Sequence, residues 1–291
     1  MKYRITHETE YRYAVPVSVG HNQVFLRPRD LTGRQRCLRS VIEFAPRPAS
    51  SNLRHDYFGN ASTLFVINEP HTQMLVTAVS EVEVSPSDLP IPGMSPPWEA
   101  VCDAVRGDRS AAALDTMQFI YESPLVRVLP ELTDYARASF TPGRPVFDAA
   151  QDLTHRIFTD FTYDPTTTTV STPVDEVFRL RSGVCQDFSH LQIAMLRGLG
   201  LPARYVSGYL RTFKDEGDPQ LIGADASHAW LAVGDGQGHW ADFDPTNDLI
   251  PAEHHVTVAW GRDYADVSPV RGVIVGGGYQ TIDVRVDVES I

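Results

Sequence analysis

A chain of 291 residues, 42% of them hydrophobic, is long enough to form one large domain or two ordinary ones around a substantial core. Its formal net charge of -12 argues against nucleic acid as the main partner, because contacts to a phosphate backbone rely on clustered lysine and arginine. No run approaches the roughly 18 consecutive apolar residues of a membrane helix, and the N-terminus lacks the apolar segment of a signal peptide. We therefore expect a cytoplasmic protein with no membrane partner.

Roughly the first 80 residues are expected to form an antiparallel β-sandwich. Residues 3–13 and 75–84 alternate between apolar and polar side chains, which is the period of a half-buried strand. Turn signals at residues 27–30 and 58–60 separate the strand-like runs.

A proline-rich stretch marks the boundary between two predicted domains. Residues 85–97 contain five prolines and one glycine, a composition typical of an extended connection. We predict that residues 1–95 form a β-rich domain with its linker. Residues 96–291 are predicted to form the second domain, together with the C-terminal strands.

Helical patterns follow this boundary and then give way to strands, so the fold class is predicted as α+β. The expected helices cover residues 98–105, 131–140, 146–161, 173–181 and 185–199. One apolar stripe on the helix at 146–161 contains Phe147, Ala150, Leu153, Ile157 and Phe158. Three strands are expected after Gly200, at residues 203–211, 228–233 and 239–243.

The three cysteines, Cys37, Cys102 and Cys185, are too few and too far apart for a disulfide framework or a paired metal or redox motif. Cys185 stands where a loop containing Gly183 becomes a helix, beside unpaired backbone N–H groups and the positive end of the helix dipole. Both favour the reactive thiolate, and the same N–H groups suit an oxyanion.

Other readings of these cysteines stay open. A small buried apolar side chain is the commonest state of a free cysteine, and Asp187, two residues after Cys185, would oppose a thiolate if its carboxylate were near. Cys37 and Cys102 have no acid–base partner in their neighbourhoods, so both are interpreted as structural.

His228 and Asp244 are predicted to face each other across an antiparallel hairpin. If Gly234 to Gly238 form the loop, paired positions sum to 472, and 228 and 244 also sum to 472. Their Cβ atoms would then lie about 5 Å apart, close enough for the carboxylate to hold the imidazole. A slip of one residue would place the two on opposite faces. The alternative is a histidine satisfied by a neighbour and an aspartate that only opens the Asp-Pro-Thr turn.

No metal and no cofactor are expected. A zinc site from Cys185 and His190 with His239, His254 or His255 is the alternative, but these histidines lack a ligand spacing such as HxxxH, and no EF-hand loop is present. Tyr163 could reach a cleft as a hydrogen-bond donor, although a packed aromatic is the simpler role for it.

Four segments resemble the transglutaminase-like superfamily, whose core presents Cys, His and Asp in this order. They are Gly183-Val-Cys-Gln-Asp-Phe-Ser-His-Leu191, Gly200-Leu-Pro-Ala-Arg-Tyr-Val-Ser-Gly-Tyr209, Ser227-His-Ala-Trp230 and Trp240-Ala-Asp-Phe-Asp-Pro-Thr246. The strand-rich N-terminus and residues 254–267 resemble the bacterial subgroup with an extra N-terminal β domain. The resemblance implies a papain-like core in which Cys185 is the nucleophile, His228 the general base and Asp244 the orienting carboxylate.

The function implied by this resemblance is acyl transfer at amide carbonyls through a Cys185 thioester. The implied partner is a protein or peptide substrate with an amide side chain or a peptide bond. Two alternatives remain open: a cysteine peptidase or amidase that hydrolyses the same intermediate, and a non-catalytic protein-binding module. The sequence does not indicate the oligomeric state.

Overall fold

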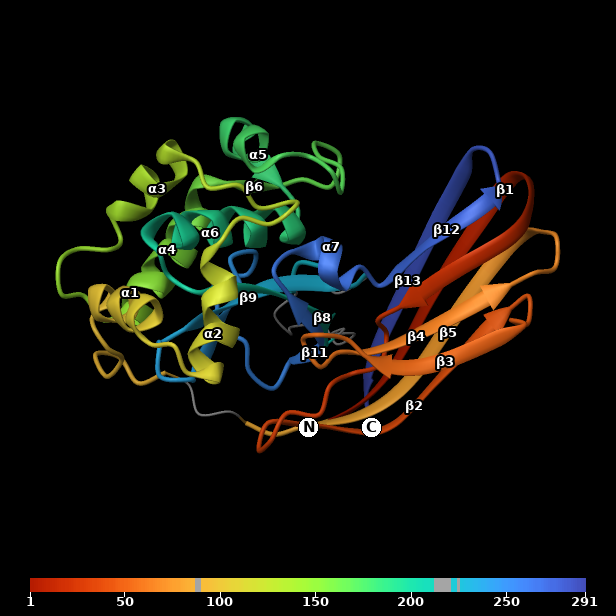
Figure 1. Cartoon of the computed structure of the whole chain (residues 1–291), viewed down its shortest axis with the longest axis horizontal. Helices are drawn as coiled ribbons and strands as arrows, with labels where there is room; N and C mark the ends of the chain where they lie inside the picture. The colour runs from red at the N-terminus through yellow and green to blue at the C-terminus, as the bar shows by residue number, and fades with distance from the viewer. Residues whose placement is uncertain (87–89, 212–220, 224–225) are drawn as a thin grey trace.

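A seven-stranded antiparallel sheet is built from both ends of the chain (Figure 1). The computed structural model describes residues 1–86, 90–211, 221–223 and 226–291. The strand order is β2-β5-β1-β4-β3, and β12 and β13 also pair with β1. These strands are β1 (Lys2–Val24), β2 (Gln35–Ala45), β3 (Ser50–His55), β4 (Ala61–Ile67), β5 (His71–Val84), β12 (Val270–Gly276) and β13 (Gln280–Ser290).

The long strand β1 is shared by two halves of this sheet. Its first part pairs with β5 and β13 and its last part with β4 and β12, and the register with β5 shifts between Arg12 and Val17. An apolar cluster joins the halves, and in it Phe44 of β2 lies 4.1 Å from Phe65 of β4 between ring centroids. The expected N-terminal antiparallel sandwich is therefore present, with both layers belonging to one continuous sheet.

The C-terminal strands differ from our expectation. We assigned them to residues 96–291 with the core, but β13 pairs with β1 from Tyr3↔Ser290 to Tyr13↔Gln280, and β12 pairs with the last part of β1. Alternation along a strand shows which face is buried but does not say which sheet the strand joins. The chain therefore starts and ends in the same sheet.

The second part of the chain places helices around a four-stranded sheet of order β10-β9-β8-β11 (Figure 1). Helix α6 is almost entirely buried and packs against β8 and β9. The helices are α1 (Trp98–Gly107), α2 (Ala111–Met117), the 3-10 helix η1 (Gln118–Ile120), α3 (Pro130–Arg137), α4 (Val146–Asp160), α5 (Val174–Leu180), α6 (Cys185–Leu199) and α7 (Tyr264–Val267). The strands are β6 (Thr162–Tyr163), β7 (Ser182–Gly183), β8 (Ala203–Leu210), β9 (His228–Gly234), β10 (Trp240–Phe243) and β11 (His255–Gly261).

Helix α4 follows the predicted apolar stripe except at its end. Ala150, Leu153 and Ile157 are fully buried and Phe147 packs against the same core, but Phe158 is 43% exposed. Ile157 lies near the middle of the buried stripe, and Phe158 lies about 100° around the helix from it, which places Phe158 outside the stripe. None of the described helices is both long and apolar enough to cross a membrane.

The two sheets contact each other through buried polar and apolar groups. Tyr3 and Ile5 of β1 belong to the same apolar cluster as the core helices. His7 of β1 hydrogen-bonds to the Tyr209 hydroxyl of β8 at 2.9 Å. The Gln35 amide donates to the carbonyl of Thr257 in β11 at 2.7 Å and accepts from its N–H at 2.8 Å. The N-terminal sheet is thus fastened to the strands that carry the site described below.

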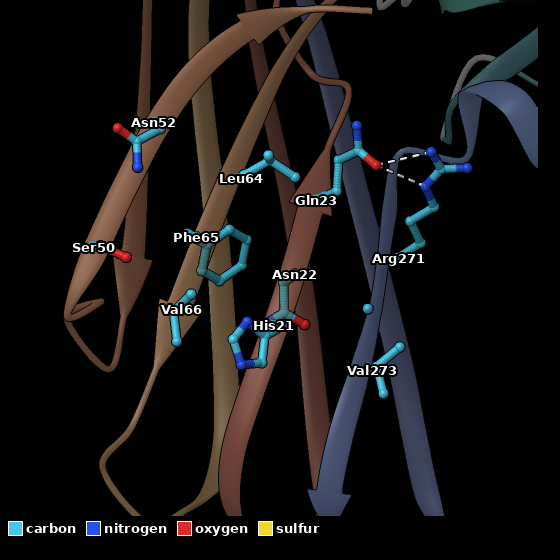
Figure 2. Close-up of a pocket in the computed structure, with 11 residues that line it drawn as sticks. His21, Asn22, Gln23, Ser50, Asn52, Leu64, Phe65, Val66, Arg271 and Val273 are labelled. Carbon is cyan, nitrogen blue, oxygen red and sulfur yellow. Dashed lines mark hydrogen bonds between the residues drawn. The ribbon is translucent and has the colours of Figure 1, made fainter.

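The outer face of the β3-β4-β1-β12 half is hollowed over a volume of about 460 Å³ (Figure 2). Leu64, Val66 and Val273 contribute its apolar floor and sides. Arg271 lies at its edge, where its guanidinium donates to Gln23 Oε1 at 3.0 and 2.8 Å. This hollow belongs to the N-terminal sheet and contains none of the predicted site residues.

Candidate active site

Cys185 is the first residue of helix α6, as the sequence predicted. The preceding residue, Val184, has extended backbone, so the chain turns into the helix directly at the cysteine. The thiol is half-buried, while Cys102 is buried. Cys185 therefore lies beside the free N–H groups of the first helical turn, where negative charge is stabilised.

The carboxylate of Asp187 caps the N-terminus of helix α6. Its Oδ2 accepts hydrogen bonds from the Val184 N–H at 2.9 Å and from the Thr168 hydroxyl at 2.6 Å. A Cβ on Gly183 would lie 2.7 Å from this oxygen, so glycine is needed where the carboxylate folds back. Burial raises the pKa of Asp187, against the two hydrogen bonds that lower it. The aspartate thus fixes the start of the helix that presents Cys185.

His228 and Asp244 are joined by a buried hydrogen bond. His228 Nε2 donates to Asp244 Oδ2 at 2.8 Å, and both side chains are 0% exposed. The strand register that we predicted is wrong by two residues: Trp240 pairs with Gly234 and Phe243 with Leu231, so paired positions sum to 474. A shift of two keeps both residues on one face, and the side chains therefore still meet.

Two further side chains bind the same carboxylate oxygen of Asp244. His255 Nε2 lies 3.2 Å from Oδ2, and the Asn247 amide donates to it at 2.9 Å. The backbone N–H of Thr246 donates to the other oxygen, Oδ1, at 2.9 Å. Sequence reasoning missed both side chains as partners of Asp244. His255 was considered only as a zinc ligand, and its place beside β8 on strand β11 has no local signal near residue 244.

These contacts set the protonation of the site. Burial alone would lower the pKa of His228, but the charge of Asp244 and then that of Cys185 outweigh it and raise this pKa to about 10. Burial works against the ionised form of Asp244, yet its bonds to His228 and His255 hold its pKa well below the usual range. Burial lowers the pKa of His255, which favours a neutral ring that donates through Nε2.

The other ring nitrogen of His228, Nδ1, takes no part in the hydrogen bond to Asp244. Nδ1 has no hydrogen-bond partner among the described residues. A Cβ on Gly223 would lie 2.7 Å from it, so the backbone at 223 closes over this edge of the ring. Cys185 acts on the His228 ring and raises its pKa, and because Nε2 is held by Asp244, Nδ1 is the nitrogen left for the thiol.

The chain matches two family models in chain order. Residues 3–83 match the bacterial transglutaminase-like N-terminal region, and residues 133–245 match the transglutaminase-like superfamily core. An uncharacterized protein of Mycobacterium tuberculosis is 43% identical over 99% of this chain and 92% of its own length. The chain belongs to the transglutaminase-like superfamily.

Two further similar proteins match this transglutaminase-like chain in different ways, one in its fold and one in part of its sequence. One solved structure, from Cytophaga hutchinsonii, is described as a candidate cysteine protease and is 22% identical in sequence to this chain. The match has a TM-score of 0.75 and covers 100% of this chain and 91% of the solved chain, which shows that the two share a fold. A protein-glutamine gamma-glutamyltransferase from Pseudomonas aeruginosa is 29% identical over 45% of this chain and 20% of its own length.

The other residues that the sequence analysis considered for the site of this transglutaminase-like chain make structural contacts instead. His190 is buried in α6 and accepts the Tyr264 N–H at 3.1 Å, and burial lowers its pKa to about 4. His239 is paired with Asp235 at 2.9 Å in the hairpin loop. Tyr163 packs at the edge of the main core cluster. The alternative zinc set, Cys185 and His190 with another histidine, is not among the groups of converging ligand atoms in the described residues.

A different group could hold a metal ion. His228, Asp244 and His255 each offer a ligand atom, and these atoms lie within 4.8 Å of one another. The same atoms are already joined by the two imidazole-to-carboxylate hydrogen bonds, which explains their convergence without an ion. The expectation that no metal is needed stays a prediction.

The buried His228–Asp244 pair predicts a specific pH dependence of stability. Its contribution is complete where Asp244 is ionised in both states, above about pH 3.8, and His228 is protonated in both states, below about pH 6.5. It is lost as pH rises from 6.5 to about 10, because only the folded state then holds the proton on His228. Urea unfolding between pH 5 and 10 is expected to show this fall in the free energy of unfolding, and His228→Gln should remove that part of it. Identical slopes in both proteins would contradict the assigned ion pair.

His255 is predicted to be a positioning residue. His255→Leu removes a hydrogen bond to an ionised carboxylate, worth about 1.5–3 kcal/mol, so acylation of Cys185 should slow by at least roughly tenfold. His255→Gln keeps a donor near Nε2 and should retain more activity than the leucine variant. The measurement is the pH profile of acylation, which should move in the leucine variant only. Equal loss in both variants with an unchanged profile would point to packing alone.

Proposed function

We propose that this protein transfers acyl groups from amides through a thioester on Cys185. The proposal rests on the His228–Asp244 hydrogen bond at 2.8 Å, which occupies Nε2 and leaves Nδ1 for Cys185, a group that acts on this ring and raises its pKa. Cys185 is the nucleophile, His228 the general base and acid, and Asp244 the carboxylate that fixes the ring and stabilises its protonated form.

The first step forms the thioester between Cys185 and the acyl group and releases the amine. Because the pKa of His228 is raised to about 10, the imidazole already holds its second proton at neutral pH, and Cys185 attacks as the thiolate of a thiolate–imidazolium pair. The sulfur forms a bond to the carbonyl carbon as the carbonyl π electrons move onto the oxygen. The carbonyl oxygen then carries the negative charge, for which the N–H groups at the start of α6 are the expected donors. As the C–N bond breaks, the imidazolium gives its proton to the departing amine.

The second step decides the reaction class. An amine that attacks the thioester gives transglutamination, whereas water gives peptidase or amidase chemistry. The gamma-glutamyltransferase and the candidate protease among the similar proteins represent these two outcomes. The substrate that we propose is a protein or peptide with a glutamine side chain or an accessible peptide bond.

Mass spectrometry of a peptide library incubated with the protein, with and without an added primary amine, tests this proposal. Amine adducts at glutamine would support transfer, and new peptide termini would support the peptidase alternative. The Cys185→Ala protein is the control, because it lacks only the thiol. Products that form equally with Cys185→Ala would contradict catalysis by this cysteine.

The non-catalytic alternative is a binding module that uses the N-terminal sheet. The hollow over β3, β4, β1 and β12 is the observation in its favour (Figure 2). A binding module has no need for a buried ion pair aligned with a cysteine at a helix N-terminus. Peptides that bind the protein unaltered, with no dependence on Cys185, would favour this alternative.

A further inference from the structure

We propose that a second pocket, centred on Arg204 and separate from Cys185, binds a small carboxylate. This Arg204 pocket has a volume of about 220 Å³ and lies where three parts of the chain meet. Its lining includes Arg204 of β8, Trp240 of β10, Trp260 of β11, Phe119 of η1, Asp115 of α2 and Tyr57 from the β3–β4 turn. The N-terminal sheet and the core therefore both contribute to it.

The guanidinium of Arg204 lies over two indole rings. Its Cζ atom lies 4.3 Å from the ring centroid of Trp240 and 3.9 Å from that of Trp260. Arg29 of the N-terminal part covers the other face of Trp260 at 3.5 Å, and Phe119 packs edge-on against Trp240 at 5.4 Å. Cation–π stacking satisfies the two faces of a guanidinium but none of its N–H donors, which lie in its plane.

The donor edge of Arg204 makes no hydrogen bond to the part of the chain that the structure describes. Its Nε is buried without a hydrogen bond, and the described residues provide no hydrogen bond or ion pair to any of its nitrogens. The charge of Asp242 raises the pKa of Arg204, but the Asp242 carboxylate forms its ion pair with Arg34. Burial lowers the pKa of Arg204 to about 9, so the group still carries its charge at neutral pH.

Arg204 is half-buried, and its charged guanidinium has a buried Nε that makes no hydrogen bond to the described residues. Leaving such a donor unsatisfied is costly, and a planar anion at this edge would offset that cost. A carboxylate fits best because its two oxygens match two parallel N–H donors. The aromatic walls favour an apolar body behind that carboxylate, and the volume limits the ligand to a small molecule or one terminal group of a larger one. Asp115 is the opposing feature, since its exposed carboxylate at the pocket repels an anion.

Isothermal titration of the full chain with benzoate, benzamide and inorganic phosphate tests the proposal. Benzoate should bind, and uncharged benzamide of the same shape should bind at least roughly tenfold more weakly. Asp115→Asn removes a negative charge from an exposed helix position and should tighten benzoate binding. Arg204→Gln should weaken it roughly ten- to a hundredfold, while the exposed control Arg127→Gln should not change it.

Several outcomes of these titrations would contradict a carboxylate site at Arg204. Equal binding of benzoate and benzamide, or benzoate affinity unaffected by both Arg204→Gln and Asp115→Asn, would overturn the proposal. Binding of phosphate but not benzoate would overturn the choice of a carboxylate. If Arg204→Gln does not fold, the Asp115→Asn comparison carries the test, because that side chain makes no hydrogen bond among the described residues. All arms can be read in the Cys185→Ala protein, so they do not depend on catalysis.

Discussion

Asp244→Asn is expected to slow the formation of the acyl-enzyme by roughly 10⁴-fold. Oδ2 of Asp244 accepts hydrogens from His228, His255 and Asn247, while Oδ1 accepts the Thr246 N–H. An asparagine that keeps the Thr246 bond must turn its NH₂ group toward three other donors. His228 would then lose both its orientation and the charge that raises its pKa. The rate of product formation from the amide substrate identified in the peptide library measures the effect.

The hairpin offers a matched control for this substitution. Asp235 also pairs with a histidine, His239, at 2.9 Å, but that ring is exposed in the loop. Asp235→Asn should therefore leave the rate within a few-fold of the wild type. A rate for Asp244→Asn that is no lower than that for Asp235→Asn would contradict the role we give to the buried carboxylate.

Gly208→Ala is expected to give the largest loss of stability among single small substitutions near the site. A Cβ at this position would lie 2.1 Å from the Val256 carbonyl oxygen and 2.5 Å from Cη2 of Trp230. The first contact is with backbone, so strands β8 and β11 would have to separate. We expect a cost of about 1–3 kcal/mol or more in the free energy of unfolding, measured with urea. Trp230 lies 5.2 Å from His255 between ring centroids, so activity should fall as well.

Gly107→Ala is the control for this test. It ends helix α1, and an added Cβ would meet nothing within 4 Å. Alanine should be neutral there or stabilise the fold by up to about 1 kcal/mol. If Gly208→Ala is as stable as Gly107→Ala, the close approach of β11 and Trp230 to β8 is contradicted.

The sequence predicted the position of Cys185 and the meeting of His228 with Asp244 because both depend on local patterns. A helix start and a hairpin are each contained in a few consecutive residues. The register itself was off by two, since Gly234 is still paired and the loop runs from Asp235 to His239. His228 and Asp244 still lie on the same face of the hairpin because the error in register was an even number of residues.

The partners that the sequence did not predict come from distant elements. His255 reaches Asp244 because β11 joins the sheet beside β8, and a crossing of this kind has no signature near either residue. The return of β13 to β1 is non-local in the same way, as it pairs residues at the two ends of the chain. The Arg204 pocket likewise needs the β3–β4 turn, α2, η1 and three core strands to be in place before its residues meet.

Iodoacetamide labelling followed by peptide mapping tests the central claim about Cys185 most directly. Burial raises the pKa of both Cys37 and Cys102, that of Cys102 to about 11, so both should react slowly at neutral pH. Cys37 is half-buried like Cys185 and is the matched control for accessibility. We predict fast labelling confined to Cys185, which slows in His228→Ala. Labelling of Cys185 no faster than that of Cys37, or unchanged by His228→Ala, would contradict its role as nucleophile.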